Sequence, residues 1–206
     1  MNLTEVVKRI EQFPGALVDC SFGQGRDAFL KQLEARTGRN EKYSVDMYIE
    51  DCRDTIAELI ERVATYEIPD DYISFLELYG GFLLDFDDYH LSTLGIGPMV
   101  ENWYSSIDSD DALSEINQYG FIHVGGLSFG KYPEEKIQVV TFLQDLAGTI
   151  EKHCVIGIGP WRVDTLTPID ISKDIHAYPD YWRKVANSFT EWLVQVAETQ
   201  GRFGYL

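Results

Sequence analysis

Residues 126–130 have the G-x-S-x-G spacing of a nucleophile elbow, the strained turn that exposes the catalytic serine of an α/β-hydrolase. Two aspartates and a histidine follow Ser128 in the order of that enzyme class: Asp164, Asp170 and His176. The elbow requires a helix that begins at the serine, and Pro133 would interrupt that helix. We therefore interpret the segment as a glycine-rich turn between strands, and a serine hydrolase using Ser128 remains a remote alternative.

The histidines and cysteines lack the spacing of a metal site. No two of the four histidines stand four residues apart, as a zinc pair on one helix face would; they are His90, His123, His153 and His176. The three cysteines are far apart and odd in number, which is typical of buried free thiols in a reducing cytoplasm; they are Cys20, Cys52 and Cys154. We expect no metal and no cofactor.

Two acidic clusters, at residues 85–88 and 108–111, lie close in sequence to aromatic side chains. One interpretation is that they are solvated loop residues, with Asp110 or Asp111 capping a following helix. The other is a recognition surface, because aromatic rings surrounded by carboxylates are good anchors for a basic protein. The predicted partner-binding residues are Asp85, Asp87, Asp88, Tyr89, Trp103, Tyr104, Asp108, Asp110 and Asp111.

The net charge favours a protein partner over a nucleic acid. The 206 residues include 34 acidic and 17 basic side chains, giving a formal charge of −17. Contacts to phosphates need Lys and Arg, so nucleic acid and anionic membranes are disfavoured, whereas a basic protein would be attracted. Solubility alone is the alternative reason for the charge. We find no membrane span and no secretory leader in the pattern, and we expect a cytoplasmic protein.

Residues 68–81 carry the clearest helix signals in the chain. Pro69 suits the first helical position, and the acidic pair after it stands beside the positive end of the helix dipole. Gly80 is predicted to end the helix in a left-handed conformation. The apolar stripe recurs at i, i+3, i+4 and i+7; it consists of Tyr72, Phe75, Leu76 and Tyr79.

The remaining pattern predicts an α+β fold. Helical periodicity dominates the first third, apart from a short strand at residues 16–20, and an apolar stripe predicts a helix over residues 182–196. A short helix is expected at residues 111–118. The strands expected between these helices are residues 82–86, 121–124, 137–143, 154–158 and 169–171. This order favours helices packed against a largely antiparallel, multi-stranded sheet.

Two of these segments resemble the SUKH superfamily of Smi/Knr-type proteins. Ile68-Pro69, Tyr72, Phe75-Leu76 and Gly80-Gly81 match its signature helix, and residues 185–193 are similar to its closing helix. Residues 122–130 look like its strand and glycine turn. The resemblance covers roughly residues 56–196. We therefore predict a SUKH-like α+β domain at residues 46–206, with residues 1–45 as an N-terminal helical extension packed on its core.

The resemblance implies a binding protein and not an enzyme. The family includes bacterial immunity proteins that bind and neutralise toxin domains, often nucleases, and fungal regulators of cell-wall synthesis. A nuclease presents a basic groove, which suits a partner of charge −17. We expect an immunity protein that occludes its cognate toxin, with no residue performing chemistry. The alternative is a regulatory scaffold that binds a cellular partner.

Overall fold

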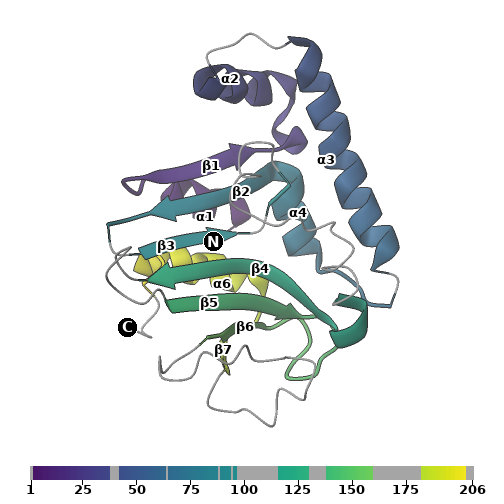
Figure 1. Cartoon of the computed structure of the whole chain (residues 1–206), viewed down its shortest axis with the longest axis vertical. Coiled ribbons are helices and arrows are strands. Elements are labelled where there is room, and N and C mark those ends of the chain that lie inside the picture. Colours follow the sequence, from purple (N-terminus) through teal and green to yellow (C-terminus); the bar gives the residue numbers. More distant parts are fainter. Residues whose placement is uncertain are drawn as a thin grey trace.

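The structure, a computed structural model, describes residues 2–37, 42–63, 65–87, 89–93, 95–96, 116–129, 138–159 and 182–202. The described strands form one antiparallel sheet of seven, and their order in the sheet is their order in the chain (Figure 1). They are β1 (Ala16–Cys20), β2 (Tyr79–Asp85), β3 (Tyr89–Thr93), β4 (Phe121–Phe129), β5 (Gln138–Asp145), β6 (Val155–Ile158) and β7 (Trp182–Ala186). The predicted α+β class, with helices on a largely antiparallel sheet, is confirmed.

The helices cover one face and one end of this sheet. They are α1 (Leu3–Ile10), α2 (Arg26–Thr37), α3 (Lys42–Arg62), α4 (Asp70–Leu78) and α6 (Phe189–Thr199), with a 3-10 turn, η1, at Phe22–Gln24. Residues 116–119 are also helical and overlap the short helix predicted at residues 111–118. Figure 1 shows α6 behind the strands and α2 beyond β1 at the edge of the sheet. The expected strand at residues 169–171 lies outside the described residues.

The N-terminal segment belongs to the same sheet and core as the rest of the chain. The strand predicted at residues 16–20 is β1, and it pairs with β2. Val6, Val7 and Ile10 of α1 are fully buried in the main hydrophobic core. The predicted boundary between residues 45 and 46 lies inside α3.

Helix α4 passes directly into β2, where a glycine stop is predicted. Tyr79 is already extended, with φ −132° and ψ 128°, and Gly80 is part of the strand. The Leu78 carbonyl accepts hydrogen bonds from Ser21 N and from Gln24 Nε2. These bonds satisfy an end carbonyl of the helix, so no left-handed residue is needed to do so.

The predicted helix over residues 182–196 is two elements. Its first part is β7, which pairs with β6, and α6 begins only at Phe189. The break lies at Ser188, whose side chain accepts the Glu191 amide, while the Glu191 carboxylate accepts the Asn187 amide. This Ser-x-x-Glu arrangement is a helix-start signal that outweighs the apolar spacing before it.

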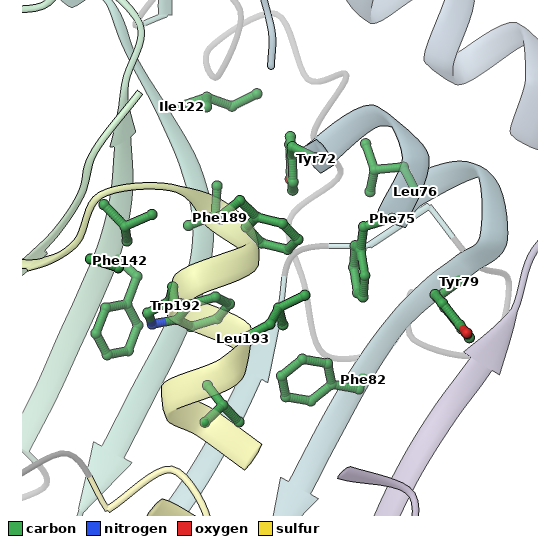
Figure 2. Packing of buried hydrophobic residues seen from close by; sticks show 14 of the residues in the cluster. Tyr72, Phe75, Leu76, Tyr79, Phe82, Ile122, Phe142, Phe189, Trp192 and Leu193 are labelled. Carbon is green, nitrogen blue, oxygen red and sulfur yellow. The ribbon is translucent and has the colours of Figure 1, made fainter. Parts of the chain in front are cut away.

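The two segments that carry the family resemblance meet in the core (Figure 2). The centroid of the Phe189 ring lies 4.8 Å from that of Tyr72 and 5.1 Å from that of Phe75, and both pairs are edge to face. Beside them, Asp71 Oδ2 accepts the Thr190 amide at 2.8 Å. A carboxylate at this place accepts a hydrogen bond from an amide that has no partner within the first turn of α6. Its negative charge also interacts favourably with the positive end of the helix dipole.

Replacing Asp71 with alanine should destabilise the protein by about 1 kcal/mol, the usual cost of losing a helix cap. Urea denaturation monitored by circular dichroism measures the loss. The matched control is Asp70→Ala, which removes a carboxylate from the same turn of α4 and is expected to cost less. Equal losses in both variants would contradict the capping role of Asp71.

Candidate partner-binding surface

The hairpin between β2 and β3 holds the first predicted acidic cluster at the surface. Asp85 and Asp87 are exposed. The turn is closed by a hydrogen bond from the Phe86 amide to the Tyr89 carbonyl at 3.0 Å, and the two rings stack with centroids 4.5 Å apart. A Cβ atom at Gly15, whose φ is +78°, would lie 2.5 Å from the Asp85 carbonyl oxygen, so glycine is required for this close approach.

Tyr89 is placed in the core and not at the surface. Its side chain is 1% exposed, and its hydroxyl donates to the Gln200 carbonyl at 2.6 Å. The Arg202 guanidinium lies 5.2 Å from the ring centroid. The expectation of an exposed aromatic anchor therefore has to be revised, because this ring ties the hairpin to the end of α6.

The other predicted partner-binding residues lie outside the described residues. They are Asp88, Trp103, Tyr104, Asp108, Asp110 and Asp111. The surface that the structure brings together from the prediction thus consists of Asp85 and Asp87.

His90 is a member of this surface that the sequence reasoning missed. Its Nδ1 lies 2.6 Å from Asp85 Oδ1, and both side chains are about half exposed. Residues that flank a hairpin turn pair across it, so the spacing of Asp85 and His90 was the available signal. The exposed pair fixes the direction of the Asp85 carboxylate more than it adds stability.

Ser128 does not stand on a nucleophile elbow. Residues Gly126 to Phe129 are a continuous part of β4, paired with β3 on one side and with β5 on the other. The prediction of a turn between strands is therefore wrong for these four residues. Ser128 faces His90 across the ladder, and the side chain that the structure places against the His90 ring is Asp85.

His123 is half-buried and Cys154 is fully buried. The His123 ring donates through Nε2 to the Gly125 carbonyl at 2.8 Å, and burial lowers the pKa of its imidazole. Burial raises the pKa of the Cys154 thiol to about 11, which keeps it protonated and unreactive. Within the described part of the chain, no three His, Cys, Asp or Glu side chains are placed to hold a metal ion.

A second group of exposed carboxylates, not foreseen from the sequence, lies on α3, the helix at the opposite end of the sheet from the hairpin (Figure 1). Arg26 Nε lies 2.6 Å from Asp46 Oδ1, and Arg62 Nη1 lies 2.9 Å from Glu58 Oε1. The exposed acidic residues of α3 are Asp46, Glu50, Asp51, Asp54, Glu58 and Glu61. Apart from Asp51, which is adjacent to Glu50, these residues recur every three or four positions, and that spacing was the signal for one acidic helix face.

Comparison of the chain with protein-family models, with curated proteins and with solved structures gives no match. The resemblance to the SUKH superfamily therefore stays a prediction from the sequence. Across the described helices, none combines the length and the apolar character that crossing a membrane requires.

The lowered pKa of His123 predicts a loss of stability in mild acid. The unfolded imidazole takes up a proton near its ordinary pKa of 6.5, whereas the folded one does so only at a lower pH. The free energy of unfolding should therefore fall as the pH drops below about 6.5. Urea titrations of the wild type and of His123→Gln between about pH 7.5 and about pH 5.5, which span about one unit either side of that value, measure the difference. Parallel pH profiles would contradict this role of the imidazole.

Proposed function

We propose that this chain is a non-catalytic protein-binding module, and that it acts as a bacterial immunity protein that neutralises a toxin domain with a basic face. The observation that carries the proposal is the acidic β2–β3 hairpin. Its carboxylates are exposed at Asp85 and Asp87, while Tyr89 holds its backbone against α6. A rigid surface loses little conformational entropy on binding, which favours affinity.

Electrostatics supports a basic partner. With a charge of −17, the chain attracts a cationic surface over several ångströms and speeds the encounter at low salt. A nuclease that must hold nucleic acid presents such a surface. Binding there would occlude the substrate path of the toxin, and no side chain of this protein would take part in a reaction.

The resemblance to SUKH proteins supports the immunity role. The two segments that carry it contact each other through Tyr72 and Phe189, so they form one structural unit in the fold. The three cysteines, all within the described residues, form no disulfide, which suits the reducing cytoplasm where an immunity protein meets an incoming toxin.

The test is binding to the toxin domain encoded by the neighbouring gene, measured by surface plasmon resonance. We expect a stable complex whose association slows as salt rises. Asp85→Asn combined with Asp87→Asn should weaken the affinity about tenfold, mainly through slower association.

The matched control is Glu11→Gln combined with Glu198→Gln. This pair also removes two negative charges, from exposed sites directly after α1 and in the last turn of α6. These substitutions should leave the affinity nearly unchanged. Absence of binding by the wild type would contradict the function. Equal weakening by both pairs would mean that net charge, and not the hairpin, governs the complex.

A further inference from the structure

The face of the sheet opposite α1 and α6 carries an apolar pair of side chains. Val18, Phe82 and Leu91 point into the main core, which contains residues of both helices. Because neighbouring residues of a strand point to opposite faces, Leu17 and Leu83 lie on the other face. They stand opposite each other in the ladder between β1 and β2. Leu17 is 49% exposed and Leu83 is half-buried, so this face presents the pair to solvent.

The same face continues into the acidic hairpin. Asp85 follows Leu83 by two residues, so it points to the same side, about 7 Å further along the strand. Its cross-strand partner is His90, whose Nδ1 lies 2.6 Å from the Asp85 carboxylate. The apolar pair is therefore bordered by a carboxylate whose direction is fixed.

Small residues occupy the middle of this face. From Leu83 the row continues through β3, β4 and β5 as Ser92, Gly126 and Thr141. Among the described residues, a Cβ atom at Gly126 would meet one heavy atom within 4 Å, the Val140 carbonyl oxygen at 3.9 Å. Gly126 itself is only half-buried. Within the described part of the chain, this leaves room over Gly126 for a side chain of another protein.

A partner would reach β1 from this face and not from the edge of the sheet. Helix α2 covers the edge with Gln32, whose Nε2 donates to the Val18 carbonyl and whose Oε1 accepts the Cys20 amide, each at 2.6 Å. The ladder also has a register shift between Asp19 and Cys20. Both features oppose the addition of a further strand. A contact on this side of β1 is therefore one between side chains.

We propose that this face, centred on Leu17 and Leu83, is the apolar centre of the interface with the toxin domain, an inference that rests on the proposed function. Contiguous apolar area bordered by polar groups is typical of protein interaction sites, whose centres are apolar and whose rims are charged. The occupant is a basic protein surface that presents an apolar side chain flanked by Lys or Arg. That side chain contacts the leucine pair, while the flanking cations approach the hairpin carboxylates.

The two parts of such a surface act on different rate constants. Long-range attraction by the hairpin carboxylates speeds the encounter, whereas apolar contacts form only in the complex and slow its dissociation. Leu17→Gln should therefore raise the dissociation rate constant about tenfold. The association rate constant and its salt dependence should stay unchanged, because the substitution removes no charge.

Gly126→Gln is the second variant. It adds bulk without charge at a position where the described residues leave space for a Cβ atom. Its side chain would clash with a partner bound over the sheet, so the affinity should fall about tenfold.

Surface plasmon resonance measures both rate constants against the toxin domain used to test the proposed function, and circular dichroism verifies that each variant is folded. The matched control is Met47→Gln on α3. Met47 is 53% exposed, but its helix lies at the opposite end of the sheet from the hairpin (Figure 1). This control should bind with the rate constants of the wild type.

Unchanged binding by Leu17→Gln or by Gly126→Gln, to a toxin whose association still depends on the hairpin carboxylates, would overturn this inference and leave the proposed function standing. Equally fast dissociation of Met47→Gln would also overturn it, because loss of any exposed apolar side chain would then explain the effect. A wild type that does not bind the toxin would overturn the function and the inference together.

Discussion

The contact between α4 and α6 is the interaction on which the rest of the structure depends. It combines one hydrogen bond, from the Thr190 amide to the Asp71 carboxylate, with the packing of Phe189 against Tyr72 and Phe75. Helix α4 continues into β2 without a linker, and α6 follows β7 after two residues. Because β2 lies next to one edge of the sheet and β7 forms the other, this contact fixes both sides of the sheet relative to each other.

The same helix connects the core to the candidate surface. In the first turn of α6, the Thr190 amide donates a hydrogen bond to the Asp71 carboxylate. Just beyond the last turn, the Gln200 carbonyl accepts a hydrogen bond from the Tyr89 hydroxyl. The acidic hairpin therefore has a fixed place relative to the helix that carries half of the family resemblance. A binding role needs such a fixed surface, because a carboxylate on a mobile loop loses part of its attraction to the entropy of ordering.

The sequence allowed the class of the fold to be predicted, because apolar periodicity is strong in α1 and in residues 70–78. It failed where a local signal competed with periodicity. Residues 182–186 have helical apolar spacing, yet they form β7, since the Ser188 cap starts the helix later and β6 offers a free edge. Strand β3 was missed because its first residue, Tyr89, follows an acidic turn and was grouped with it.

The candidate surface was predictable only in part, for a different reason. Exposed carboxylates such as Asp85 and Asp87 follow from polarity alone. The burial of Tyr89 depends on Gln200, which is 111 residues away, and the pairing of Gln32 with β1 depends on how two helices pack beyond the sheet edge. No local pattern carries such long-range information, since a side chain's exposure is decided by elements that are distant in the chain.

The most direct test of the account is hydrogen–deuterium exchange of this protein alone and in complex with the proposed partner, a toxin domain with a basic face. The account predicts slower exchange in the β2–β3 hairpin on binding, while the amides of α1 and α6 exchange at unchanged rates. Protection confined to α1 and α6, with the hairpin unaffected, would contradict the hairpin as the partner-binding surface.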